Sequence, residues 1–200
     1  MNCKGLLWAI GKNARIAFFI LIGAILLKKV FMSLVGAVVL LLLFATTRSD
    51  TFRVERSIAV KAEPARVYAL LNDFHAFGSW SPWEKLDPKM TVNHSGATSG
   101  PGAVYTWDGN DGVGAGRMEI LKSEPDTRVI VKLDFLKPFE GHNTSEYTLA
   151  SAAGTTTVTW AMYGPSPYIS KLMGIFVSMD RMIGKDFERG LSNLKAQVEK

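Results

Sequence analysis

The chain has 200 residues, of which 20% are charged and 48% hydrophobic, and its formal net charge is +5. This composition excludes a disordered chain of low hydrophobicity. Residues 1–48 hold six of the 23 Lys and Arg residues and no Asp or Glu, so the 17 basic and 18 acidic residues that remain leave residues 49–200 at −1. The basic character belongs to a short leader, and no nucleic acid is expected as a partner.

The leader contains two apolar runs on either side of a basic pair. Residues 16–27 form an uninterrupted run of twelve, Lys28 and Lys29 follow, and residues 30–45 form a second run of sixteen. A membrane-spanning helix needs ~20 apolar residues, with a range of ~17–25. The second run reaches this range when the next two residues are added, whereas the first is too short. We expect residues 1–47 to be a membrane anchor whose main apolar run is 30–45.

The basic pair sets the expected orientation, because basic residues stay on the cytoplasmic side of an inserted helix. The N-terminus is then inside, and residues 48–200 are outside. A cleavable signal peptide is the alternative, but the sequence near Ala45 has no clean Ala-x-Ala cleavage pattern. An uncleaved, single-pass signal anchor is therefore favoured. Residues 1–26 are either an upstream extension from a misassigned start or an additional interfacial or re-entrant element.

Cysteine and histidine usage argues against disulfides and metal sites. Cys3 is the only cysteine, so residues 48–200 contain no disulfide and no thiolate ligand. His75, His94 and His142 show no metal-binding spacing. We expect the domain to be held together by its hydrophobic core alone, with no metal and no cofactor.

The domain begins with a strand and two short helices. Residues 52–60 alternate between apolar and polar side chains, which predicts a half-buried strand. Pro64 suits the first turn of a helix, and apolar residues at helical spacing follow it as far as Leu71. Residues 74–80 predict a second short helix, which ends before Pro82.

An antiparallel meander follows. Short strands are predicted at 91–93, 103–108, 116–123, 129–135, 143–150 and 156–163, separated by turn sequences such as Gly109-Asn-Asp-Gly112. Strand spacing of ~8–12 residues is typical of such a meander. With the first strand, the sheet has six to seven strands.

The C-terminal region, from Tyr168 onward, contains no proline and repeats apolar residues at three- or four-residue steps. This pattern predicts one long amphipathic helix, bent at Gly184. The expected fold is therefore α+β, with a curved antiparallel sheet wrapped around this helix. One helix does not fill a strongly curved sheet, so we expect a cavity between them.

Several stretches carry a family resemblance through their order along residues 51–200. They are Val54–Val60, Ala62–Leu70, Trp80–Trp83, Asp87–Pro88, Tyr105–Asn110, Gly114–Met118, Thr156–Trp160 and Asp186–Lys195. In this order the chain resembles the SRPBCC superfamily of START-like, helix-grip proteins of the polyketide cyclase, dehydrase and lipid-transport type. The resemblance implies a hydrophobic ligand cavity between sheet and helix, but no single activity. The apolar leader is similar to that of membrane-anchored bacterial members, which implies the inner (cytoplasmic) membrane, with residues 48–200 on the periplasmic side.

No catalytic constellation stands out in the sequence. There is no Gly-x-Ser-x-Gly motif, and the glycines of Gly112–Gly116 are better explained by a bulged hairpin than by a phosphate loop. Asp108, Glu146 and Tyr163 are the acid/base candidates, but strand parity points Glu146 outward, and Asp108 adjoins a turn. We assign no catalytic residue and leave an enzymatic role open.

Aromatic and methionine side chains on the predicted inner faces are the candidate ligand-binding residues. They are Trp80, Trp83, Tyr105, Trp107, Met118, Phe135, Tyr147, Trp160, Met162, Met173 and Phe176. Such residues serve either as plain core or as an adaptable, apolar cavity lining. Trp80 and Trp83 follow the short helices, where we expect the mouth of the cavity.

Three functions are consistent with these observations. The first is a membrane-tethered module that binds a hydrophobic small molecule or lipid. The second is an enzyme of the cyclase or dehydratase kind acting on a polyketide-like substrate, which needs a carboxylate or histidine inside the cavity. The third is a solidly packed structural or interaction domain.

Overall fold

The computed structural model describes residues 26–200, which divide into two compact units with a boundary between Arg48 and Ser49. The expectations for residues 1–25 lie outside the described residues. The first unit contains the helix Leu26–Thr46, whose 21 residues have a mean hydropathy of 2.3. This helix is long and apolar enough to cross a membrane, although a signal sequence meets the same criterion. Insertion, orientation and cleavage stay predictions.

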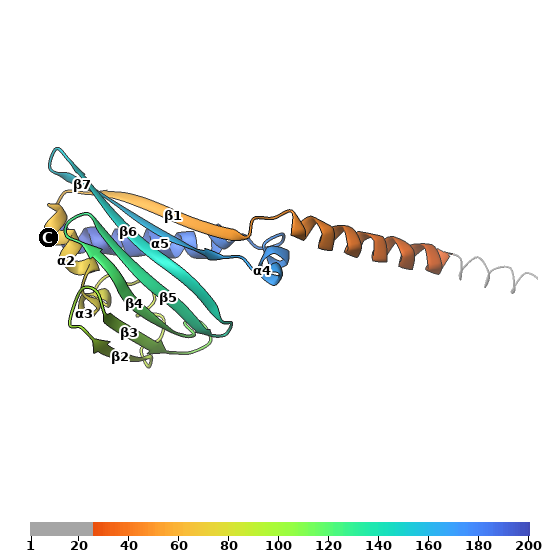
Figure 1. Cartoon of the computed structure of the whole chain (residues 1–200), viewed down its shortest axis with the longest axis horizontal. Coiled ribbons are helices and arrows are strands. Elements are labelled where there is room, and N and C mark those ends of the chain that lie inside the picture. The colour runs from red at the N-terminus through yellow and green to blue at the C-terminus, as the bar shows by residue number, and fades with distance from the viewer. Residues whose placement is uncertain (1–25) are drawn as a thin grey trace, which may run out of the picture. The chain divides into compact units, whose positions relative to one another are not determined.

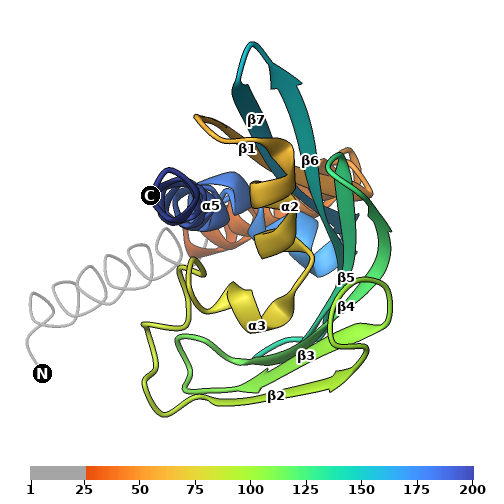
Figure 2. The same ribbon diagram turned by 90° about the vertical axis from the view of Figure 1, so that its left-hand side faces the viewer.

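The second unit is one antiparallel sheet with four helices (Figure 1). In chain order its elements are β1 (Thr51–Val60), α2 (Pro64–Leu71), α3 (Phe74–Phe77), β2 (Thr91–Gly96), β3 (Ala103–Asp108), β4 (Ala115–Glu124), β5 (Arg128–Lys137), β6 (Gly141–Ala152), β7 (Thr155–Pro165), α4 (Tyr168–Met173) and α5 (Met179–Val198). The strand order is β1-β7-β6-β5-β4-β3-β2. Figure 2 shows the sheet curling around α2, α3 and α5. The α+β class and the antiparallel meander are confirmed.

The hairpins follow from local turn chemistry. Between β6 and β7 the turn consists of Ala153 and Gly154, which have φ values of 50° and 75°. Two successive residues with positive φ are typical of the type I′ turn, whose twist matches that of the flanking strands. The register Ala152↔Thr155 closes directly on this turn and fixes which side chains face inward.

The core lies between the concave face of the sheet and the helices α2 and α5. On β1, the buried Val54 and Val60 face inward, as the alternation predicts. α5 lies mainly against β1. Its buried side chains recur at helical spacing, at Phe187, Leu191, Leu194 and Val198. These positions confirm the amphipathic pattern for the C-terminal half of the predicted helix.

The prediction of one continuous C-terminal helix was wrong. α4 ends at Met173, Gly174 caps it, and α5 begins only at Met179. The apolar repeat suited each helix separately, and a glycine at the break gives no propensity for continuing a helix. Gly184, where a bend was predicted, lies within α5. A Cβ at this position would overlap the guanidinium of Arg56, which explains why the residue is a glycine.

Arg56 joins β1 to the first turns of α5. Its guanidinium lies on the inner face of the strand and donates to Asp180 Oδ1 at 2.7 Å and to Glu188 Oε1 at 2.8 Å. The hydrogen bonds from these carboxylates, Asp180 first, raise the pKa of Arg56 above its ordinary value. The alternation of β1 places Arg56 among inward apolar residues. Its charge is accommodated there because Asp180 and Glu188 pair with it.

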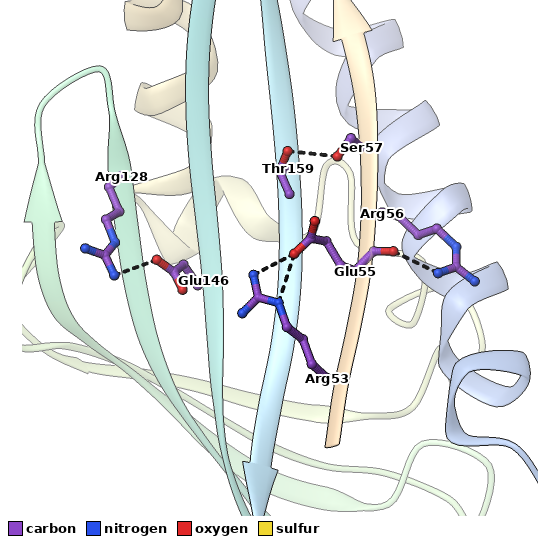
Figure 3. A network of polar contacts seen from close by, with 7 residues as sticks. All are labelled: Arg53, Glu55, Arg56, Ser57, Arg128, Glu146 and Thr159. Atoms are coloured by element: carbon purple, nitrogen blue, oxygen red, sulfur yellow. Dashed lines mark hydrogen bonds and ion pairs between the residues drawn. The ribbon is translucent and has the colours of Figure 1, made fainter. Parts of the chain in front are cut away.

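The outer face of the sheet carries polar pairs between and along strands (Figure 3). Arg128 Nη2 lies 2.6 Å from Glu146 Oε1, and the hydroxyls of Ser57 and Thr159 are 2.8 Å apart. Glu146 therefore faces outward, as strand parity predicts. Such pairs near the surface contribute little stability individually, ~0–1 kcal/mol. Because these polar pairs cover the outer face, the opposite, concave face is the one available for an apolar site.

Candidate functional site

At one end of the sheet, strands β1, β4 and β6 begin and strands β3, β5 and β7 end. The registers Thr51↔Pro165, Phe135↔Gly141 and Trp107↔Gly116 bring these strand ends together. We call this the Trp107 end of the sheet; its strands can be followed in Figure 1. Trp107 and Phe135 are only half-buried there, although both lie on the inner face.

Large and small residues alternate across the strands at the Trp107 end. The register runs Trp107↔Gly116, Gly116↔Phe135 and Phe135↔Gly141. The rings of Trp107 and Phe135 meet edge to face, with centroids 6.0 Å apart and an interplanar angle of 86°. The indole lies over Gly116, where a Cβ would overlap it. The result is a half-buried aromatic floor formed by β3, β4 and β5.

A second row, one step deeper, adds one polar contact to the apolar surface. It runs Tyr105↔Met118, Met118↔Leu133 and Leu133↔Asn143. The Tyr105 hydroxyl donates to Glu84 Oε1 at 3.1 Å. Burial, and secondarily the Glu84 carboxylate, raise the pKa of Tyr105 far above its ordinary value, so the phenol stays protonated at neutral pH and acts as a donor.

The deeper interior is filled by aromatic packing. The rings of Trp160 and Phe187 stack with centroids 4.0 Å apart and an interplanar angle of 5°. Trp80 meets Trp160 edge to face at 5.7 Å, and Tyr147 lies 5.3 Å from Trp160. The indole Nε1 of Trp160 donates to Ser145 Oγ at 2.8 Å. Aromatic side chains therefore pack closely in this part of the interior, and the predicted cavity between sheet and helix stays a prediction.

Two hollows lie at the surface of the described part of the chain. One, of about 520 Å³, is a polar surface depression lined by Lys185, Glu188, Arg189 and Ser192 of α5. The other, of about 310 Å³, lies at the Trp107 end. It is lined by Thr91, Asn93, Thr106, Trp107, Asp108, Ala115, Gly116, Arg117, Leu136 and Lys137. Thr106, Arg117 and Leu136 have the opposite strand parity to Trp107 and Phe135, so this hollow opens on the outer face of the sheet and shares only Trp107 and Gly116 with the aromatic floor.

The structure sorts the predicted ligand-binding residues into three groups. Six are buried, namely Trp80, Tyr105, Met118, Tyr147, Trp160 and Met162. Three are half-buried, namely Trp83, Trp107 and Phe135. Met173 and Phe176 are 55% and 73% exposed, because the break between α4 and α5 takes them away from the sheet-facing helix. Trp80 is 2% exposed and does not form an opening. Ligand contact stays a prediction for every member.

Sequence reasoning missed Gly116, Leu133 and Glu84. Gly116 belongs to a glycine-rich stretch that the sequence assigns to a bulged hairpin, and a register shift does occur between Ala115 and Gly116. The pairing of Gly116 with Trp107 depends on register across two strands, which a single sequence does not reveal. Glu84 directly follows Trp83 in the sequence, and nothing in that position indicated that its carboxylate reaches Tyr105.

The acid/base candidates do not form a site on the inner face, because Tyr163 hydrogen-bonds to Glu146 on the outer face and Asp108 lies apart from both. Asp108 is exposed and pairs with Lys137 at 3.2 Å, and Glu146 pairs with Arg128 on the outer face. Within residues 26–200, no group of three or more His, Cys, Asp or Glu side chains is placed to hold a metal ion. The carboxylate of Glu84 does reach the inner face of the sheet, where it accepts from the Tyr105 hydroxyl.

Comparisons with known proteins agree on the fold. The model of a family described as polyketide cyclase / dehydrase and lipid transport matches residues 51–199. A comparison with curated proteins gave no match. The solved structure of major latex-like protein 151 from Panax ginseng is similar at 12% identity and a TM-score of 0.56, covering 76% of this chain and 100% of that one.

Two further solved structures extend the likeness. Protein CV1439 from Chromobacterium violaceum shares 17% identity at a TM-score of 0.53, covering 76% of this chain and 98% of that one. The di-domain ARO/CYC StfQ from the steffimycin biosynthetic pathway shares 12% identity at a TM-score of 0.54, covering 74% of this chain and 51% of that one. At these identities the likeness concerns the fold alone.

Proposed function

The chain belongs to the family of polyketide cyclase, dehydrase and lipid-transport proteins, and from this we propose that it is a membrane-tethered module that binds a hydrophobic small molecule or lipid. The observation that carries the proposal is the half-buried floor of Trp107, Gly116 and Phe135 on the concave face. A ligand that covers this floor removes apolar surface that the folded chain leaves partly in water.

The size of the expected effect follows from the area covered. Burial of apolar surface contributes ~25 cal/mol per Å², so a ligand that covers about 200 Å² gains about 5 kcal/mol before the costs of association. The Trp107 and Phe135 rings, set nearly at right angles beside glycine backbone, offer an apolar surface rather than a shaped polar pocket. Such a surface suits an acyl chain or a fused-ring compound better than a polar metabolite. Tyr105 lies beside Trp107 but is itself buried and donates its hydroxyl proton to the half-buried Glu84, so the Glu84 carboxylate is the polar group left to meet a head group.

Native mass spectrometry of the full-length protein extracted from membranes tests the proposal. We expect a mass adduct that corresponds to an apolar molecule, and about a tenfold lower adduct occupancy in Trp107→Ala/Phe135→Ala, because lost ring area of this size is worth ~1–3 kcal/mol. The matched control is Leu121→Ala, which removes an apolar side chain that is 50% exposed on β4.

Two results would contradict ligand binding at the Trp107 end. One is wild-type protein that carries no adduct while remaining folded, which favours the solidly packed structural domain. The other is equal occupancy in the double variant and in Leu121→Ala, which places the ligand elsewhere.

The tether has its own expected result. If Leu26–Thr46 spans the inner membrane with Lys28 and Lys29 on the cytoplasmic side, protease added to intact bacterial spheroplasts degrades residues 48–200 of the full-length protein. A cytoplasmic protein of the same cells serves as the control and survives until lysis. Protection of residues 48–200 until lysis would reverse the orientation, and release of the domain into the medium without protease would indicate cleavage.

A further inference from the structure

A run of exposed apolar side chains occupies the corner between α4 and α5, residues 168–182. Seven large hydrophobic residues there are between 39% and 73% exposed, namely Tyr168, Ile169, Met173, Phe176, Val177, Met179 and Met182. Elsewhere in residues 49–200 the exposed large apolar residues are four, at Leu86, Leu121, Leu136 and Phe139, and of these only Leu136 and Phe139 are near one another in the sequence. Single exposed apolar residues are ordinary on a soluble surface, whereas a cluster marks an interaction surface.

The turn between α4 and α5 is hydrogen-bonded through its own backbone. The amides of Phe176 and Val177 both donate to the carbonyl of Met173, and the Gly174 amide donates to Ser170. Leu172 and Ile175 turn inward and are half-buried, while their neighbours Met173 and Phe176 face outward. In this turn the bonded backbone and the outward apolar side chains reduce the cost of entering an apolar phase.

Two contacts hold this corner to the first residues of the domain. Lys171 Nζ forms an ion pair with the Asp50 carboxylate, and the Ser166 amide donates to the Asp50 carbonyl at 2.7 Å. The Lys171 side chain is only 10% exposed. The corner therefore moves with Asp50, which directly precedes β1.

The length of chain before Asp50 points to the occupant of this surface. The apolar helix ends at Thr46, four residues earlier along the chain. Extended chain covers at most about 3.6 Å per residue, so about 15 Å is the largest separation that these four residues allow, whatever orientation the domain takes. If the helix spans a bilayer, Asp50 cannot leave the neighbourhood of the headgroup region. A lipid surface is thus available to the corner at all times, which is not so for a second copy or another protein.

We propose that the α4–α5 corner docks in the headgroup region of the bilayer, with Ile169, Met173 and Phe176 entering the boundary with the acyl chains. This inference rests on the membrane tether of the proposed function. The corner follows β7, whose last residue pairs with the first of β1, so it belongs to the Trp107 end of the sheet. Docking keeps the aromatic floor close to the lipid phase, where a hydrophobic ligand is concentrated.

Depth-dependent quenching in liposomes tests the docking. The full-length protein carries Cys3→Ser, and an environment-sensitive fluorophore is attached at Met182→Cys in the corner or, as the control, at Leu121→Cys on β4; both native side chains are at least 50% exposed. The vesicles contain phosphatidylcholine and phosphatidylglycerol, with a nitroxide on the lipid. We expect several-fold stronger quenching at 182 than at 121. Ile169→Glu/Phe176→Glu should abolish the difference, because carboxylates oppose insertion into the acyl boundary.

Flotation of the same vesicles separates this inference from the proposed function. Protein that fails to float with the vesicles would contradict the membrane tether itself. Protein that floats while positions 182 and 121 are quenched equally would overturn the docking and leave the tether standing. In a third outcome, the fluorophore at position 182 reports a more apolar environment as protein concentration rises, with no quenching by the lipid nitroxide. That result would assign the corner to contact with a second copy, which also overturns the docking.

Discussion

Replacing Phe187 with alanine is expected to lower the free energy of unfolding by about 3–5 kcal/mol, the usual cost of deleting a buried phenylalanine ring. Phe187 is 1% exposed and stacks on Trp160 at 4.0 Å. Trp83 closes over the same side chain, with ring centroids 6.5 Å apart. The variant leaves a cavity bounded by large, rigid rings that cannot easily collapse into it. Urea unfolding of the full-length protein in detergent, followed by near-ultraviolet circular dichroism, measures the change.

Phe176→Ala is the matched control for this experiment, since it makes the same chemical change at a residue that lies between α4 and α5 instead of within α5. Its side chain is 73% exposed, so the expected change in the free energy of unfolding is within about 0.5 kcal/mol. Equal losses in the two variants would show that the stack of Phe187 on Trp160 does not form the centre of the core.

Gly116→Ala is expected to destabilise the domain by about 1–3 kcal/mol, although it adds a single methyl group. The new Cβ would overlap the Trp107 ring and would lie 2.5 Å from the carbonyl oxygen of Asp134 on β5. The indole can move only by leaving the floor, and the carbonyl only by disturbing the β4–β5 register. Adduct occupancy should therefore fall together with stability, which thermal unfolding and native mass spectrometry measure on the same full-length protein.

Gly141→Ala provides the comparison within the same row of the sheet. The nearest atoms to its added Cβ are the Asn143 Nδ2 at 3.6 Å and the Phe135 Cδ2 at 3.9 Å, which are ordinary van der Waals distances. Alanine also reduces the entropy of the unfolded chain, so we expect no loss and up to about 1 kcal/mol of gain. If Gly116→Ala were as harmless as Gly141→Ala, the floor would be mobile enough to accept the methyl group.

The sequence predicted what local periodicity determines. Alternation identified β1, and it placed Glu146 on the outer face. Helical spacing identified α5 through residues such as Leu194. These signals are local, because the burial of every second or every third to fourth side chain depends only on the element itself. The antiparallel class followed from short connections, which leave few alternatives.

The remaining features depend on contacts between distant residues. Arg56 breaks the apolar alternation of β1 because two carboxylates on α5 meet it, and no spacing within β1 announces them. The packing of Trp80 against Trp160 depends on how the segment after α3 is placed relative to β7, which neither local sequence determines. The aromatic floor needs the register of β3, β4 and β5 together, so Gly116 could be recognised as a turn glycine but not as the residue beneath Trp107.

The strand order also has a consequence for how the domain assembles during synthesis. β1 is made first, yet its only partner in the sheet is β7, through registers from Thr51↔Pro165 to Val60↔Thr156. Closing this pair joins segments about a hundred residues apart, which is slow compared with forming the hairpins between β2 and β7. Until then, β1 and the free edge of β7 both present unpaired backbone amides that can bind other chains. A chain truncated before residue 155 would leave β1 without a partner, and its edge would be the first place to aggregate.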